Sequence, residues 1–166
     1  KIFYFCGMER IALFPRSFDP ITRGHESIIR RALPLFDRII VAIGVNADKK
    51  SFFPSEQRKA WINELFADEP AVEVIEYDGL TVDVCKKHNA NYILRGLRTS
   101  ADFEFERMVG QINKKLDQDI ETVYLLTMPE YTTLNSSVVR EVYKHGGDIS
   151  QFVPVTVKPR RVAPKE

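Results

Sequence analysis

The chain is poor in the features that mark cross-linked, membrane-spanning and nucleic-acid-binding proteins. It has only two cysteines in 166 residues, Cys6 and Cys85, too few for a disulfide framework. No apolar run approaches the roughly 20 residues that cross a bilayer. A formal net charge of +1 gives no field that would attract nucleic acid or a membrane surface. Since a charged-then-apolar secretory leader is also absent, we expect a cytoplasmic protein with no nucleic-acid or membrane partner.

Three common ligand-binding signatures are absent as well. The sequence contains neither the glycine–lysine loop of Walker A proteins nor a GxGxxG fingerprint, and its cysteines and histidines lack zinc-site spacing. We therefore expect no metal held by protein side chains, and a phosphate-binding site would use another arrangement.

The length suits one domain with a core large enough to need no covalent staples. Residues 1–7, which precede Met8, resemble the remnant of an expression tag, and we expect no function from them. We expect a single domain over residues 8–157. Residues 158–166, basic and interrupted by prolines, are predicted to form a tail.

Apolar, β-branched runs alternate along the chain with segments of helical pattern. The predicted strands are Ile11–Phe14, Ile39–Val45, Val72–Ile75, Tyr92–Leu94 and Thr122–Leu126. The predicted helices are His25–Leu33, Ser55–Phe66, Thr81–His88, Ala101–Leu116 and Ser136–Lys144. Because the strands are continuously apolar, they suit parallel strands buried on both faces. The alternation predicts an α/β fold: a doubly wound, Rossmann-like, five-stranded parallel sheet with helices on both faces.

The loops that follow the strands are the places to look for a ligand, because such sheets bind ligands beyond the carboxyl ends of their strands. Three of the five loops at that edge carry basic side chains, although the chain as a whole is nearly neutral. Cations gathered at one edge favour a polyphosphate ligand.

The first loop carries the most informative run of the chain, FPRSFDPITRGH at residues 14–25. It joins a strand to a helix, so the free N–H groups and the positive dipole end of the helix point at one spot. His25 stands in the first turn of that helix. It can donate a hydrogen bond to a phosphate in a transition state, a role we favour over helix capping alone.

Two further segments offer phosphate-binding groups. The run RGLR at residues 95–98 combines two arginine forks, which match phosphate oxygens bidentately, with a glycine that permits close backbone approach. Residues 131–140 place several hydroxyls at a helix N-terminus, where one of the polar side chains can also cap the helix. Phe103 and Phe105, on the helix between these segments, are expected to be packing residues rather than base-stacking ones.

These motifs resemble those of the phosphopantetheine adenylyltransferase family within the nucleotidyltransferase superfamily. Residues 17–25 resemble its signature (S/T)FDPxTxGH, with Thr22 in place of the first histidine of the more general HxGH form. Residues 95–106 resemble its block RGLRxxxDFE(Y/F)E, and residues 131–140 contain a run similar to ISSSxx(R/K). The resemblance covers most of the chain, residues 9–154.

The resemblance implies an enzyme of coenzyme A biosynthesis. ATP and 4′-phosphopantetheine would give dephospho-coenzyme A and pyrophosphate by direct in-line attack, without a covalent intermediate. It also implies Mg²⁺ bound to the polyphosphate, a homohexamer in the bacterial cytoplasm, and coenzyme A as a candidate feedback ligand.

The resemblance further implies roles for individual residues. His25 would stabilise the pentavalent transition state, with Lys49 and Arg98 as the other catalytic residues. The 4′-phosphopantetheine site would comprise Ser17, Lys49, Thr81 and Arg95. The ATP site would comprise Ser17, Phe18, His25, Gly96, Leu97, Arg98, Glu106, Tyr131, Thr132, Thr133, Leu134, Asn135, Ser136 and Ser137. No residue is implied as a metal ligand.

The chain departs from the family pattern at two positions. Arg16 stands where the family has glycine, and at a backbone position of positive φ this would cost roughly 1–2 kcal/mol. Its side chain would either occupy the nucleotide pocket or add a phosphate contact. We favour occupation, so Arg16→Gly is expected to raise kcat/KM. Asn135 replaces the first serine of ISSS, and because asparagine caps helices equally well we expect a mild effect.

Three other interpretations stay open. A sister nucleotidyltransferase would act on nicotinate mononucleotide or a phospho-alcohol, against which Thr22 and the block at residues 95–106 argue. A phosphoacceptor signalling module would need an acidic cluster after the first strand, where the loop has only Asp19. An impaired homologue would bind ATP or coenzyme A without turnover, because of Arg16.

Overall fold

The computed structural model describes residues 8–45 and 50–159. The proposed tag remnant at residues 1–7, Lys49, and residues 160–166 of the proposed tail lie outside the described residues. The expectations attached to them remain predictions.

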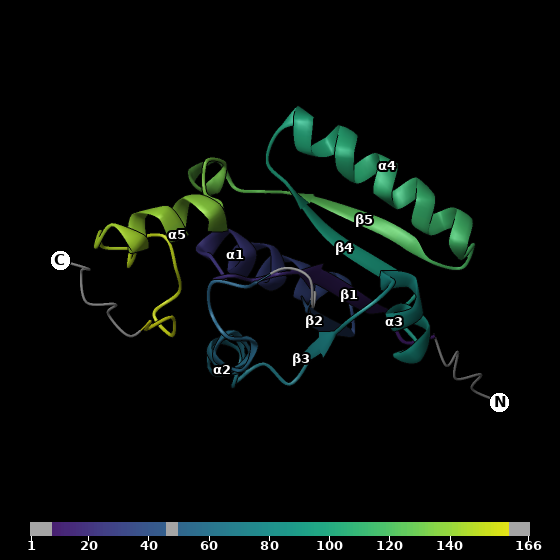
Figure 1. Cartoon of the computed structure of the whole chain (residues 1–166). Helices are drawn as coiled ribbons and strands as arrows, with labels where there is room; N and C mark the ends of the chain where they lie inside the picture. Colours follow the sequence, from purple (N-terminus) through teal and green to yellow (C-terminus); the bar gives the residue numbers. More distant parts are fainter. Residues whose placement is uncertain (1–7, 46–49, 160–166) are drawn as a thin grey trace.

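Five parallel strands form a sheet in the order β3-β2-β1-β4-β5 (Figure 1). The strands are β1 (Ile11–Arg16), β2 (Arg38–Gly44), β3 (Val72–Tyr77), β4 (Tyr92–Leu97) and β5 (Glu121–Leu126). The α-helices are α1 (Arg23–Ala32), α2 (Ser55–Leu65), α3 (Thr81–Lys87), α4 (Ser100–Leu116) and α5 (Ser136–Lys144), with short 3₁₀ turns η1 (Leu33–Leu35) and η2 (Pro129–Tyr131). The predicted doubly wound α/β fold is confirmed, and every predicted strand and helix is present.

The central strands send alternate side chains into two hydrophobic cores, which is why they read as continuous apolar runs. In β2, Ile39, Val41 and Ile43 join a core built with α1, α2 and α5. Ile40 and Ala42 of the same strand join the second core, to which α3 contributes. Helices therefore cover both faces of the sheet, and α4 lies along β4 and β5 (Figure 1).

The sheet opens where β1 and β4 end. β1 pairs with β2 along its whole length but with β4 only at Ala12 and Leu13. Pro15 has no N–H to donate. Beyond Leu13, however, β1 forms no backbone pairing with β4, so a missing donor interrupts no ladder on that side. β1 therefore continues through Pro15 to Arg16, past its predicted end at Phe14. Since the strand order reverses between β1 and β4, this opening is the topological switch point, where ligands of such folds bind.

Helix α4 exposes a row of apolar side chains. Phe105, Met108, Ile112 and Leu116 are spaced three or four residues apart and are each at least 50% exposed. We call these four residues the α4 stripe. Phe103 is 40% exposed. The expectation that Phe105 is a packing residue is therefore wrong within the single chain, whereas the Phe103 ring packs edge-on against Tyr124, with 6.3 Å between centroids.

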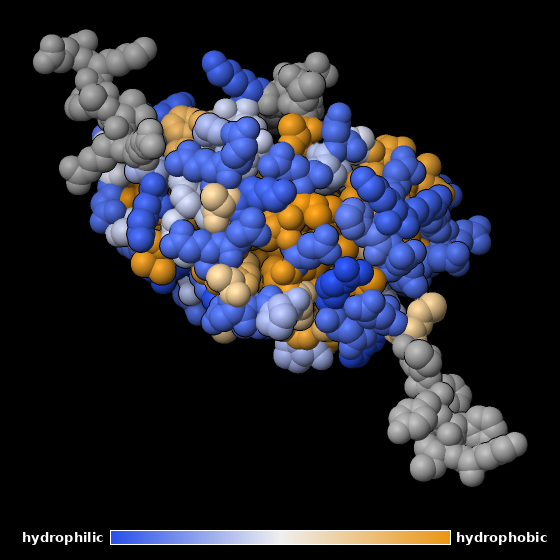
Figure 2. Space-filling model, turned by 90° about the horizontal axis from the view of Figure 1, so that it is seen from below, coloured by the Kyte–Doolittle hydropathy of each residue, from blue (hydrophilic) through white to orange (hydrophobic). Residues whose placement is uncertain are grey.

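The surface away from α4 differs in hydropathy from the α4 stripe. Seen from the side of α2 and β3, hydrophilic side chains cover most of the molecule, and hydrophobic ones are exposed between them near the middle (Figure 2). Within residues 8–45 and 50–159, no helix is both long and apolar enough to cross a membrane.

Candidate active site

A pocket of about 200 Å³ lies at the switch point between β1 and β4. Its walls come from the ends of these two strands, from α1 and α4, and from the segment that leads into α5. The lining residues are Phe14, Arg16, Ser17, Thr22, Gly24, His25, Ile28, Gly96, Arg98, Asp102, Glu106, Thr127, Tyr131, Leu134, Asn135 and Ser136. Because a helix N-terminus and several arginines meet here, the pocket suits a phosphorylated ligand.

His25 is held in one tautomer by the start of its own helix. The backbone N–H of Thr22 donates to His25 Nδ1 at 3.1 Å, while the Thr22 hydroxyl accepts from the backbone N–H of His25 at 3.4 Å. This reciprocal capping box requires the spacing of three residues between Thr22 and His25. Because Nδ1 accepts a hydrogen bond, the neutral ring carries its proton on Nε2. The ring lines the pocket, so Nε2–H is the donor offered to a ligand.

The surroundings of His25 keep the ring neutral. Burial lowers the pKa of His25 to about 3, and the positive charges of Arg16, Arg98 and Arg95 add to the shift. Phe18 packs its ring edge-on against the imidazole, with 5.2 Å between centroids, which contributes to its burial. His25 is therefore a hydrogen-bond donor near neutral pH and not a cation.

Nitrogen NMR of the labelled protein should show His25 as the neutral Nε2–H tautomer with no titration between about pH 8 and pH 5, where a free imidazole of pKa about 6.5 titrates. The folded-state pKa is lowered, so folding favours the neutral ring. The resulting stabilisation is complete above pH 6.5 and is lost as the pH falls from about 6.5 toward 3. A His25 midpoint between pH 6 and 7 would contradict this assignment.

Buried polar groups fix the loop between β1 and α1. The carboxylate of Asp19 accepts hydrogen bonds from the backbone N–H groups of Phe52 and Phe53, at 2.8 and 2.9 Å. Arg58, fully buried in α2, donates to the carbonyl of Ser17. These bonds hold the loop against the segment before α2 and leave the exposed Ser17 side chain at the pocket. Neither Asp19 nor Arg58 was among the predicted site residues.

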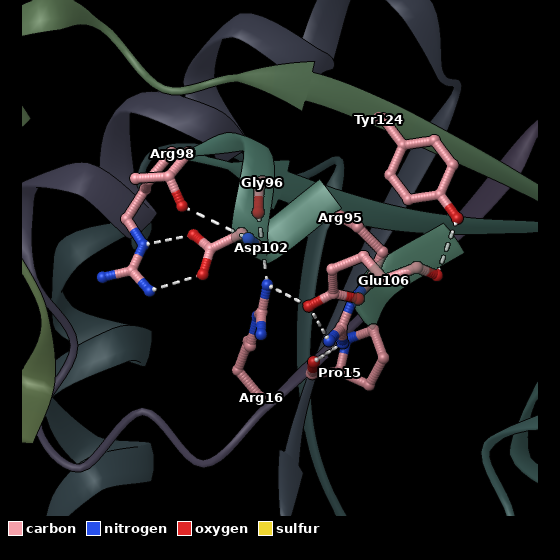
Figure 3. Close-up of polar contacts among 9 residues, drawn as sticks. Pro15, Arg16, Arg95, Gly96, Arg98, Asp102, Glu106 and Tyr124 are labelled. Atoms are coloured by element: carbon pink, nitrogen blue, oxygen red, sulfur yellow. Dashed lines mark hydrogen bonds and ion pairs between the residues drawn. The ribbon is translucent and has the colours of Figure 1, made fainter. Parts of the chain in front are cut away.

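Arg95 and Glu106 form a buried ion pair beside the pocket (Figure 3). Arg95 Nε and Nη2 donate to the two carboxylate oxygens of Glu106, both at 2.6 Å, and Nη1 donates to the carbonyl of Pro15 at 2.7 Å. The hydroxyl of Tyr124 donates to the backbone carbonyl of Glu106 at 3.0 Å. Each guanidinium nitrogen of Arg95 thus makes one bond inside the chain, which leaves one N–H of Nη1 and one of Nη2 for a further acceptor.

A smaller cavity of about 30 Å³ adjoins the pocket, and Glu106 lines both. Thr81 and Arg95, both predicted for the 4′-phosphopantetheine site, line this second cavity together. Its other lining residues are Pro15, Ile93, Val109, Gly110, Asn113 and Thr122. The predicted residues therefore divide between two neighbouring cavities.

Arg16 extends from the end of β1 along the wall of the pocket (Figure 3). Its Nη2 lies 3.0 Å from a carboxylate oxygen of Glu106 and 3.3 Å from the carbonyl oxygen of Gly96. Burial and the charge of Arg95 lower the pKa of Arg16, while Glu106 opposes the shift. Among described non-glycine residues, positive φ occurs at Phe18 and Asn89. The backbone strain considered for Arg16 is therefore absent, and only the position of its side chain matters.

The N-terminus of α5 closes the pocket on the side opposite α4. Asn135 Oδ1 accepts from the backbone N–H of Val138 at 2.9 Å, so the predicted capping of this helix is confirmed for Asn135. Ser136 Oγ donates to the carbonyl of Pro20 at 2.9 Å. Arg98 donates to both carboxylate oxygens of Asp102, at 2.9 and 3.3 Å, and lines the pocket between α4 and this segment.

The pocket brings together most of the residues predicted for the ATP site. Ser17, His25, Gly96, Arg98, Glu106, Tyr131, Leu134, Asn135 and Ser136 line it. The predicted residues Phe18, Leu97, Thr132, Thr133 and Ser137 are not among its lining residues. Phe18 is buried against Phe14 and the His25 ring, and Leu97 is buried at the end of β4. The side chains of both are therefore buried beside the pocket, and a role for either in binding ATP stays a prediction.

Several lining residues escaped the sequence analysis. Thr127 directly follows β5, so the rule that ligands bind beyond strand ends could have found it. Ile28 stands on the same face of α1 as Gly24 and could have been found from helical spacing. Phe14 could not have been found from the sequence, because the sequence pattern of a buried strand residue next to a pocket is the same as that of any other core residue.

Known proteins resemble this chain in sequence over most of its length. The family model described as cytidylyltransferase-like matches residues 13–142. A phosphopantetheine adenylyltransferase of Flavobacterium johnsoniae is 55% identical over 152 residues, covering 92% of this chain and 99% of the relative. One from Phocaeicola vulgatus is 46% identical over 149 residues, covering 90% and 98%.

Solved structures share the fold at much lower identity. The nicotinic acid mononucleotide adenylyltransferase of Plasmodium falciparum, complexed with NaAD, superposes with a TM-score of 0.65 at 18% identity, covering 90% of this chain and 93% of that one. This likeness concerns the fold alone. The extent of the family match and the identity to curated relatives show that the chain belongs to the cytidylyltransferase-like family and, within it, to the phosphopantetheine adenylyltransferases.

Proposed function

We propose that the chain transfers the adenylyl group of ATP to 4′-phosphopantetheine, giving dephospho-coenzyme A and pyrophosphate. The substrates follow from relatives that match nearly their whole length. The observation in the structure that carries the proposal is the Nε2–H donor of His25, fixed by Thr22 at the N-terminus of α1 and lining the pocket at the switch point.

The reaction is an in-line displacement at the α-phosphorus of ATP. An oxygen of the 4′-phosphopantetheine phosphate forms the new bond, and the bond to the pyrophosphate leaving group breaks, so no covalent enzyme intermediate arises. Negative charge gathers on the α-phosphate oxygens in the transition state. His25 donates a hydrogen bond to one of them, and Arg98 supplies positive charge at the same pocket. Ser17 and Lys49 are proposed to hold the attacking phosphate.

The two cavities suggest how the substrates are arranged. We assign the nucleotide to the pocket lined by His25 and Arg98, and we propose that the pantetheine arm passes beside Thr81 and Arg95. The cavity that these two residues line, about 30 Å³, has room for a water molecule but not for the arm itself. Glu106 lines both cavities, and its ion pair with Arg95 forms the boundary between them.

Mg²⁺ is proposed to enter with ATP, as part of the substrate. Asp102 and Glu106, the carboxylates that line the pocket, are both bound by arginines. Within the described parts of the chain, no group of three or more histidine, cysteine, aspartate or glutamate side chains could hold a metal ion. Phosphate oxygens and water are therefore the ligands we expect for the ion.

Pyrophosphate release tests the function. The purified chain should release pyrophosphate from ATP only when Mg²⁺ and 4′-phosphopantetheine are both present, and dephospho-coenzyme A should accumulate in equal amount. Nicotinate mononucleotide in place of 4′-phosphopantetheine is the control for a sister nucleotidyltransferase. Release with nicotinate mononucleotide alone would contradict the proposed substrate.

The resemblance to the family further leads us to propose a homohexamer in the cytoplasm, with coenzyme A as a feedback ligand. Burial of the α4 stripe between copies would account for its exposure in the single chain. By light scattering we expect six times the mass of one chain. Ile112→Lys should dissociate the assembly, whereas Gln111→Lys, on a neighbouring exposed position, should leave it intact. An unchanged mass for Ile112→Lys would contradict the role of the stripe.

A further inference from the structure

We infer that Arg16 is an internal competitor of the nucleotide: its guanidinium occupies acceptors that the nucleoside part of ATP would otherwise use. The inference rests on the proposed function for the identity of the nucleotide. It concerns a residue at which this chain departs from the family's glycine.

The contacts of Arg16 define what it displaces. Its Nη2 group lies between a carboxylate oxygen of Glu106 and the carbonyl oxygen of Gly96, at 3.0 and 3.3 Å. Both groups line the pocket and both are hydrogen-bond acceptors. A phosphate has no donor to offer them near neutral pH. The ribose hydroxyls and the adenine amino group do, so these acceptors suit the nucleoside half of ATP.

The phosphate-binding groups lie elsewhere in the pocket. The N-terminus of α1 and the Nε2–H of His25 are donors, as a phosphate requires. The pocket thus has a donor end and an acceptor end, and Arg16 covers the acceptor end. A nucleoside that donates to these two acceptors therefore has to displace the Arg16 guanidinium.

Displacement of Arg16 leaves the rest of the site in place. Glu106 keeps both of its hydrogen bonds to Arg95, at 2.6 Å each, and Tyr124 still holds its backbone. Arg16 makes only the two contacts of its Nη2 group within the described chain, and its side chain is 31% exposed. Arg16 and Arg95 both contact Glu106, and Arg16 is the more weakly bound of the two. The side chain of Arg16 is therefore the one that a ligand can displace.

Calorimetric binding of adenosine, which has no phosphate, separates competition from a phosphate contact. Arg16→Ala and Arg16→Gly should bind adenosine about tenfold tighter than the wild type, the effect of freeing one charge-assisted hydrogen-bond site. ATP should bind tighter as well, and kcat/KM for ATP should rise. Arg16→Met keeps the length of the side chain but cannot bond to Gly96 or Glu106, so it should also gain affinity for adenosine. Lys87→Ala removes an equal charge from an exposed position at the end of α3 and should change nothing.

Each other outcome overturns the inference. Weaker ATP binding with unchanged adenosine binding in Arg16→Ala would make Arg16 a phosphate contact. Unchanged binding of both ligands would show that the nucleotide does not meet Arg16. A gain in Arg16→Ala but none in Arg16→Met would show that bulk, and not the two acceptors, is responsible. Pyrophosphate release is measured separately: tighter adenosine binding without any release would overturn the proposed function and leave the role of Arg16 standing.

Discussion

His25→Ala should lower kcat for pyrophosphate release on the order of a hundredfold or more, with a smaller change in KM for ATP. The reason is that His25 lines the pocket with a neutral ring whose Nδ1 already accepts a bond from Thr22, so the Nε2–H donor is present before the transition state forms. The hydrogen bond strengthens as negative charge builds on the α-phosphate. The measurement is steady-state pyrophosphate release, normalised to folded protein by circular dichroism.

Two further substitutions separate the catalytic role of His25 from its role in the capping box. Asparagine places an acceptor where Nδ1 lies, so His25→Asn preserves the bond from Thr22 N–H but lacks the Nε2 donor. Glutamine places an amide donor where Nε2 lies but loses the Nδ1 acceptor. We expect His25→Asn to be as impaired as His25→Ala and His25→Gln to retain more activity. The reverse order would mean that capping, and not donation to the phosphate, accounts for the loss.

The sequence predicted the fold and the centre of the pocket because both depend on local patterns. Apolar runs such as Ile39–Val45 can be buried on both faces only in a parallel, covered sheet, and this pattern locates β2 within a residue at each end. The helix that follows the first loop was predicted to begin at His25, two residues inside the observed start of α1 at Arg23, and its capping box with Thr22 was not predicted.

The parts that escaped prediction depend on contacts between distant segments. Arg95 is separated from Pro15 by 80 residues, and no local pattern shows that its guanidinium donates to the Pro15 carbonyl. Arg58 lies on a helix whose sequence gives no sign that an arginine is buried, yet it holds the loop of Ser17. Phe105 was expected to pack because it is a large apolar residue. The sequence alone does not show whether such a residue lies in the core or on the surface of the single chain.

Glu106→Ala is expected to lower the free energy of unfolding by about 3 kcal/mol, the loss typical of breaking a buried ion pair from one side. The side chain of Glu106 is 5% exposed and accepts two short hydrogen bonds from Arg95, which is itself 14% exposed. Without the carboxylate, Arg95 keeps only the carbonyl of Pro15 and its charge stays buried. For a domain of this size, the change corresponds to a drop in Tm of about 6–12 °C.

Glu104→Ala is the matched control, because Glu104 stands on the same helix and also pairs with an arginine. Its partner Arg107 lies three residues away, and the Glu104 side chain is 65% exposed. Solvent screens such a pair, so its removal should cost less than about 0.5 kcal/mol. Denaturant unfolding of both variants measures the two losses in the free energy of unfolding. Equal, small losses would mean that water replaces the carboxylate beside Arg95, and that the ion pair serves to shape the boundary between the two cavities more than to stabilise the fold.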